Sequence, residues 1–260
     1  MPETVPPQDV PLDGRVALVT GGGRGIGRAI ALALGNAGAG VAVAARHLDQ
    51  VTAVAREVEA AGRPSAALVA DVTLPDQARR IVQEAATRLG PVDILVNCAG
   101  AAESAPLTRT DTAMWDRMIS ANLTSVYLCS AAALPSMLER SWGRVISIAS
   151  LAGLHGYAYV AAYCAAKHGV VGFTRAVALE VAAKGVTANA VCPGYVDTDM
   201  TRRSAERIAE KTGMPADEAR GRLAAQNPSG RLTQPEEVAA VVLRLALPEA
   251  SHVNGEAIEV

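Results

Sequence analysis

The chain has 260 residues, of which 50% are hydrophobic, 19% charged and only 3% aromatic. That length suits one ordinary domain, whose core must be built from Ala, Val, Leu and Ile. The formal net charge of −2 gives no indication of nucleic-acid or membrane-surface binding. The cysteines Cys98, Cys129, Cys164 and Cys192 have neither paired nor C-x-x-C spacing, which is typical of buried thiols in a reducing compartment rather than of a metal site or a disulfide.

The N-terminal stretch MPETVPPQDVPLDGR has neither the basic nor the apolar region of a signal peptide. We expect residues 1–11 to be a flexible lead-in and residues 12–260 to form a single domain. No apolar run approaches the ~18 residues that a membrane span needs. The sequence therefore predicts a cytoplasmic protein with neither a membrane nor a nucleic acid as partner.

Strand patterns alternate with helix patterns along the chain. Strands are predicted at 15–20, 40–46, 66–72, 92–100, 143–150, 185–194 and 255–260. Helices are predicted at 26–37, 48–62 and 74–90, with longer helical stretches around 112–137 and 158–183. The polar, charge-rich segment 195–232 is expected to be an irregular substrate loop. Near-continuous apolar strands separated by helices predict an α/β fold, a doubly wound parallel sheet of about seven strands in a single domain.

The stretch TGGGRGIG at residues 20–27 stands where the first strand gives way to the first helix. Ligands of open α/β sheets bind at the carboxyl ends of the strands. Gly21, Gly25 and Gly27 would let the backbone turn tightly and approach a pyrophosphate, which the helix N-terminus attracts. The stretch therefore favours a dinucleotide site, although its spacing is looser than G-x-G-x-x-G and glycines in such turns also serve packing.

With this turn, the sequence resembles the short-chain dehydrogenase/reductase family from Leu12 to Val260, which implies a Rossmann-like fold. NCAG at 97–100 is similar to the family's N-N-A-G motif, with Cys98 in place of the second Asn. PGYVDT at 193–198 is similar to the segment that holds the nicotinamide. The resemblance implies that Asp71 bonds the adenine ring and that Thr198 contacts the carboxamide. It also implies these further cofactor contacts: Ile26, Val72, Asn97, Ala99, Gly100, Pro193, Gly194 and Val196.

The choice of cofactor depends on the end of the second strand, which reads VAVAAR. NAD-dependent family members carry an Asp where this chain has Ala45, and Arg46 comes next. Guanidinium groups bind phosphate well, so Arg46 and Arg24 could close on a 2′-phosphate. We therefore predict NADP(H) as cofactor. The alternative is that these are two solvated arginines among the 21 in the chain.

Tyr163 and Lys167 are four residues apart, which places them one turn apart on the same face of a helix. A free tyrosine has a pKa of about 10 and exchanges protons poorly near neutrality. A nearby ammonium favours the phenolate and lowers that pKa. We predict that Tyr163 is the general acid for ketone reduction and that both residues also contact the cofactor.

Two further residues complete the predicted catalytic set. Ser150 lies 13 residues before Tyr163, the interval seen in the family, and would hold the substrate carbonyl. Ser147 is a competitor, but its place inside a strand predicts burial. Asn122 matches the family's fourth catalytic residue, which kinks its helix and holds a water on a proton path to Lys167; a buried Asn bonded to backbone is the alternative. His155 is a weaker candidate for substrate contact.

The segment 227–245 resembles 3-oxoacyl thioester reductases, so a small-molecule ketone or an acyl-thioester carbonyl is the expected substrate. The segments 165–180 and 185–196 also resemble NAD-dependent 3-hydroxybutyrate dehydrogenases, and a catalytically silent nucleotide-binding sensor is a third alternative. Arg202 and Arg203 could meet a carrier phosphate or form a solvated helix face. Apolar residues on more than one face of the helices at 112–137 and 158–183 predict a homodimer or homotetramer. Family members often continue past the last strand with a D-G-G turn, whereas this sequence stops at Val260.

Overall fold

The computed structural model describes residues 10–260 of the chain. The lead-in expected at 1–11 therefore lies, except for its last two residues, outside the described residues. Leu12 is completely buried, and its N–H donates to the carbonyl of Ala37 at 2.9 Å. The folded part of the chain thus already includes Leu12.

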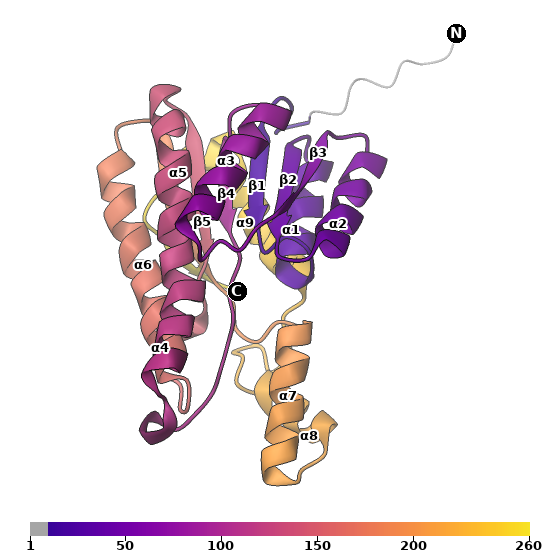
Figure 1. Ribbon diagram of the computed structural model, residues 1–260, viewed down its shortest axis with the longest axis vertical. Coiled ribbons are helices and arrows are strands. Elements are labelled where there is room, and N and C mark those ends of the chain that lie inside the picture. Colours follow the sequence, from indigo (N-terminus) through magenta and orange to yellow (C-terminus); the bar gives the residue numbers. More distant parts are fainter. Residues whose placement is uncertain (1–9) are drawn as a thin grey trace.

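Seven parallel strands form one sheet in the order β3-β2-β1-β4-β5-β6-β7, which confirms the predicted architecture (Figure 1). The strands are β1 (Val16–Thr20), β2 (Gly40–Ala45), β3 (Ser65–Val69), β4 (Ile94–Asn97), β5 (Gly143–Ile148), β6 (Val186–Cys192) and β7 (Ala257–Glu259). Several end earlier than predicted: β3 ends at Val69 rather than residue 72, and β5 at Ile148 rather than residue 150. The residues beyond these ends leave the sheet and become available to line a site.

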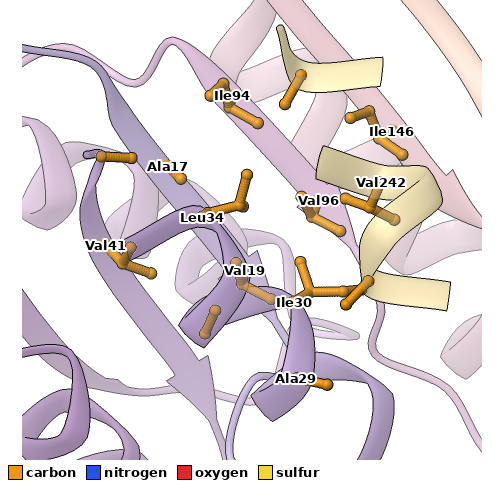
Figure 2. Close-up of a cluster of buried hydrophobic side chains, with 14 of the residues drawn as sticks. Ala17, Val19, Ala29, Ile30, Leu34, Val41, Ile94, Val96, Ile146 and Val242 are labelled. Carbon is orange, nitrogen blue, oxygen red and sulfur yellow. The ribbon is translucent and has the colours of Figure 1, made fainter. Parts of the chain in front are cut away.

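Helices cover both faces of the sheet. In chain order they are α1 (Gly25–Asn36), α2 (Leu48–Ala60), α3 (Pro75–Leu89), α4 (Thr112–Ile119), α5 (Ser125–Glu139), α6 (Ala161–Val181), α7 (Asp199–Thr212), α8 (Ala216–Ala224) and α9 (Pro235–Ala246). One buried cluster joins α1, α2 and α9 to the sheet, and a second joins α3, α5 and α6 to its other face (Figure 1). Figure 2 shows the first cluster, in which Ile30 and Leu34 of α1 lie among Val19, Val96 and Val242. Each such aliphatic side chain contributes about 1.5–3 kcal/mol on burial.

The segment 195–232 is not irregular, and that prediction was wrong. It contains α7 and α8, which pack chiefly against each other around Ala205, Ala219 and Leu223 (Figure 1). A single narrow apolar seam needs few hydrophobic residues. The other positions are charged and exposed, and for this reason the composition resembled that of a loop.

Segment 112–139 departs from the prediction that no apolar stretch of the chain is long enough to span a membrane. It comprises α4, a π-helical turn at Ser120–Thr124 and α5, and by length and composition alone this 28-residue segment could cross a membrane. Within the chain, however, α5 buries Cys129, Ala133 and Met137 against the sheet. These contacts are typical of a core helix.

The predicted assembly depends on those apolar side chains of the two helical stretches that the chain itself leaves exposed. Met114, Met118, Val126, Val170 and Val171 are buried within the chain itself and need no partner. Other apolar side chains of these helices remain exposed, with exposed fractions of 42% for Trp115 on α4, 53% for Tyr127 on α5 and 83% for Leu179 on α6.

Large exposed apolar side chains commonly mark protein interfaces. We expect a dimer or tetramer at micromolar concentration, measured by light scattering, and a shift toward smaller species in Leu179→Lys. Light scattering that reports a monomer for the unmodified chain would contradict this expectation.

Candidate active site

A cleft of about 270 Å³ opens at the carboxyl edge of the sheet, beside the glycine turn after β1. From β1, the strands that come next in the chain are added on one side of the sheet as far as β3, and those from β4 onward are added on the other side. Open α/β sheets bind ligands at such a switch point, which here lies between β1 and β4. The ends of β2, β3 and β4 and the start of α7 form the other walls.

Most of the predicted cofactor residues line this cleft. They are Gly21, Arg24, Gly25, Ile26, Gly27, Arg46, Asp71, Val72, Ala99, Gly100 and Thr198. The remaining predicted residues lie outside its lining: Asn97, Tyr163, Lys167, Pro193, Gly194 and Val196. The predicted residues in the cleft thus come from five places in the sequence, as the strand–helix alternation led us to expect.

The glycine turn suits an anion. Gly21 and Gly25 adopt positive φ angles of 66° and 52°, which side chains other than glycine rarely tolerate. The first turn of α1 contains no acidic residue, and its N-cap residue, Arg24, makes no capping hydrogen bond. The positive end of the helix is therefore left for a ligand, and the pyrophosphate of a dinucleotide fits this cradle.

Gly27 is required for a different reason, the close approach of backbone. A Cβ at this position would lie 2.2 Å from the carbonyl oxygen of Gly21. Gly27→Ala should therefore deform the turn, lower the free energy of unfolding by about 1–3 kcal/mol and weaken cofactor binding. Thermal unfolding and a cofactor titration would check both effects.

Gly221→Ala is the matched control for that prediction. Gly221 lies inside α8, and nothing would come within 4 Å of an added Cβ. The change should leave cofactor binding intact and, if anything, favour the helix by up to ~1 kcal/mol. Equal cofactor affinity in both variants would show that the contact at Gly27 is not needed.

Arg24 and Arg46 lie in the same cleft next to Ala45, and four polar neighbours there were not anticipated: His47, Gln50, Thr73 and Asp199. Arg24 Nη1 lies 3.5 Å from Asp199 Oδ2 in a half-exposed ion pair. His47 and Thr73 directly follow predicted residues, so extending each motif by one position would have found them. Asp199 begins α7 and was missed because that segment was expected to be irregular.

Asp71 is held by its own turn at the wall of the cleft. Its Oδ1 accepts hydrogen bonds from the backbone N–H of Thr73 at 3.0 Å and from the Thr73 hydroxyl at 2.7 Å. Its backbone N–H donates to Gln77 Oε1 at 2.8 Å. These bonds fix the carboxylate where a ligand in the cleft could reach it.

Lys167 and Asn122 meet at Gly100, which belongs to the wall of the cleft. A Cβ on Gly100 would lie 2.7 Å from Asn122 Oδ1 and 3.9 Å from Lys167 Nζ. Lys167 is 5% exposed, its Nζ donates to the carbonyl of Ile148 at 2.7 Å, and it lies 5.7 Å from the centre of the Tyr163 ring. The ammonium is thus close to Tyr163 but held by the end of β5.

The acidity of this pair differs from the expectation. Burial raises the pKa of Tyr163 to about 12, the charges of Tyr195 and Cys164 act in the same direction, and a hydrogen bond with Ser150 opposes them. Burial also lowers the pKa of Lys167 to about 8. The prediction that the pKa of Tyr163 is lowered is wrong, because burial disfavours the charged phenolate. The phenol remains protonated at neutral pH.

Asn122 is completely buried in the π-helical turn Ser120–Thr124. Its Nδ2 donates to the carbonyls of Ala101 at 2.9 Å and Met118 at 3.0 Å, and its Oδ1 accepts from the N–H of Ala101 at 3.2 Å. The helix is widened where a kink was expected. These hydrogen bonds to backbone match the alternative interpretation of Asn122, a buried Asn bonded to backbone.

Ser150 follows β5, and its Oγ accepts from the N–H of Ala152 at 3.1 Å. Ser147, its competitor, is buried in β5, and its Oγ accepts a hydrogen bond from Asn97 Nδ2 at 3.4 Å. Asn97 also donates to Ser130 at 3.1 Å. Ser147 and Asn97 therefore belong to a buried polar network, and Ser150 is the better placed hydroxyl.

A family model described as short chain dehydrogenase matches residues 15–209. The chain belongs to this family. A 3-oxoacyl-[acyl-carrier-protein] reductase of Vibrio cholerae is 39% identical over 96% of this chain and 96% of its own. A protein named putative ketoacyl reductase from Streptomyces coelicolor is also 39% identical, over 95% and 96% of the two chains.

Two further comparisons widen the range of activities. A D-beta-hydroxybutyrate dehydrogenase of Cupriavidus necator is 39% identical over 94% of this chain and 95% of its own. The solved structure of an actinorhodin polyketide ketoreductase variant with NADPH has a TM-score of 0.91 at 39% identity and covers 95% of each chain. This short-chain dehydrogenase is thus an oxidoreductase of the ketoreductase type.

Proposed function

We propose that this protein reduces a ketone to a secondary alcohol with NADPH in the cytoplasm. The observation that carries the proposal is the meeting of buried Lys167 and Asn122 at Gly100, on the wall of a cleft that fits a dinucleotide. Tyr163 lies one helical turn from Lys167 and is protonated at neutral pH. A proton donor therefore stands beside the site where the cofactor would supply a hydride.

The chain's own residues would perform the remaining steps. Ser150 would hold the substrate carbonyl, and the Tyr163 phenol would donate its proton to the carbonyl oxygen. Lys167 would stabilise the phenolate that results, because a positive charge nearby favours the charged form. Asn122 would keep the segment after β4 in place through its two bonds to Ala101.

Preference for NADPH is supported by charge. Ala45 places no carboxylate at the end of β2, and Arg24 and Arg46 line the same part of the cleft. The cofactor would be held by Arg24, Arg46 and the first turn of α1. Asp71 and Val72 would contact its adenine, and Thr198 would contact its carboxamide. The 3-oxoacyl thioesters implied by two relatives' names are the first substrates to try.

An NAD-dependent dehydrogenase of 3-hydroxy acids is the second candidate, because the relative from Cupriavidus necator is equally similar. Steady-state assays with NADPH and NADH, using an acetoacetyl thioester as ketone and 3-hydroxybutyrate as alcohol, would separate the two. We expect faster ketone reduction with NADPH. Preferential oxidation of the hydroxy acid with NAD would support the second candidate, and cofactor binding without turnover of any carbonyl compound would indicate a sensor.

A further inference from the structure

The helix pair α7–α8 leaves and re-enters the domain through two short segments, residues 195–197 and 231–233, which we call the neck (Figure 1). The N–H of Thr233 donates to the carbonyl of Tyr195 at 3.0 Å, and the N–H of Asp197 donates to the carbonyl of Thr233 at 2.8 Å. The two segments thus pair in parallel at Val196 and Thr233. Because α7 and α8 pack chiefly against each other, the neck determines where α7 begins.

Asn227 joins the two segments of the neck with its side chain. Its Oδ1 accepts from the N–H of Tyr195 at 2.7 Å, and its Nδ2 donates to the carbonyls of Tyr195 at 2.9 Å and Arg231 at 2.7 Å. An asparagine amide offers an acceptor oxygen and two N–H donors, and all of them are used here. Asn227 is only 5% exposed, so water is poorly placed to replace these bonds.

Gly194 makes room for this amide. A Cβ at Gly194 would lie 2.3 Å from Asn227 Oδ1 and 2.9 Å from its Cγ. Gly194 is not among the glycines with positive φ, so its backbone conformation is open to other residues. The close approach of Asn227 is therefore what requires glycine at this position.

The neck leads directly into the cofactor cleft. The carbonyl of Val196 accepts from the hydroxyl of Thr201 at 2.6 Å and from that of Thr198 at 3.4 Å. Thr198 lines the cleft, and a Cβ on Gly25 in the glycine turn would lie 3.2 Å from its Cγ2. The place of Thr198 against the glycine turn thus depends on the neck that Asn227 braces.

We propose that Asn227 is a positioning residue for hydride transfer, because through the backbone of residues 194–196 it holds Thr198 where the nicotinamide binds. The inference rests on the proposed function, in which Thr198 contacts the carboxamide. Asn227 lies outside the residues that line the cleft, so it acts through the neck and not on the cofactor itself. A misplacement of about 1 Å at a reacting centre can slow a reaction by ~10²-fold, so such a brace affects the rate strongly.

Asn227→Ala is expected to slow hydride transfer about ten- to a hundredfold in single-turnover reactions with NADPH and an acetoacetyl thioester. The Kd of NADPH should rise about three- to tenfold, the scale for loss of one hydrogen bond. Asn254→Ala is the matched control. Asn254 also accepts from a backbone N–H, that of Ala188 at 2.9 Å, and donates to a backbone carbonyl, that of Ala178 at 2.9 Å, but lies outside the cleft lining. Its loss should lower Tm and change neither kinetic value.

Gly194→Ala tests the same contact from the other side. Alone it should reproduce the losses of Asn227→Ala, because its methyl group displaces the amide. In the double variant the clash is gone, so the losses should be no greater than those of Asn227→Ala alone. Losses that multiply in the double variant would show that Gly194 and Asn227 act independently, and would overturn the inference.

NADPH binding, followed by fluorescence, separates this inference from the proposed reaction, since it needs no turnover; titration with NADH covers the second candidate function. A Kd and a hydride-transfer rate that match those of Asn254→Ala would make Asn227 a structural residue only, which also overturns the inference. Hydrogen exchange of the unmodified protein decides if the variants do not fold. Amides of residues 193–198 should be protected before cofactor is added, and rapid exchange there would contradict a brace that is already formed.

Discussion

Tyr163→Phe is expected to lower kcat for ketone reduction by at least ~10²-fold, the usual scale for loss of a general acid, while NADPH still binds. The substitution keeps the ring beside Lys167 and removes only the hydroxyl. Because burial raises the pKa of Tyr163 to about 12, the phenol is protonated at neutral pH, and the phenolate that alcohol oxidation needs as a base is scarce. Reduction should therefore be the faster direction near pH 7, and alcohol oxidation should accelerate as the pH rises.

Stopped-flow and steady-state measurements on the variant would check this expectation, with NADPH fluorescence as the binding readout. Tyr127→Phe removes a hydroxyl from an exposed tyrosine on α5 and should leave kcat unchanged. Near-normal kcat in Tyr163→Phe would remove Tyr163 from the mechanism. A loss of NADPH binding together with kcat would point instead to a collapsed site.

The double variant Ala45→Asp with Arg46→Val is expected to shift the ratio of kcat/KM values toward NADH by ~10²-fold or more. It adds a carboxylate that repels a 2′-phosphate and removes a guanidinium that attracts it. Each charge-assisted contact contributes about 1.5–3 kcal/mol, or roughly 10- to 150-fold in affinity. The two effects will not add fully, because the residues are neighbours.

Arg24→Ala alone should weaken NADPH and leave NADH nearly unchanged. Since Arg24 also pairs with Asp199 at 3.5 Å, its loss could act through α7 instead. Asp199→Asn breaks the same ion pair but keeps the guanidinium, so it should not weaken NADPH. Steady-state kinetics with both cofactors on all variants would decide, and an unmodified protein that already prefers NADH would refute the assignment of NADP.

The general architecture could be read from local patterns. Alternation of short apolar strands with amphipathic helices determines which faces must be buried, and a parallel sheet with helices on both sides satisfies that requirement. The glycines at 21 and 25 favour a tight turn after the first strand, and four-residue spacing puts Tyr163 and Lys167 on one face of a helix whatever surrounds it. These features depend on residues close together in the sequence.

Other features were decided only when distant segments packed together. Lys167 is held by the carbonyl of Ile148, and Asn122 by the backbone of Ala101, across separations of 19 and 21 residues. The acidity of Tyr163 follows from desolvation, which no spacing reveals. The helices within 195–232 were hidden because a two-helix seam needs only a few apolar residues, and their partner faces exist only in the folded chain. Local periodicity specifies elements, whereas burial and long-range contacts determine the chemistry of the site.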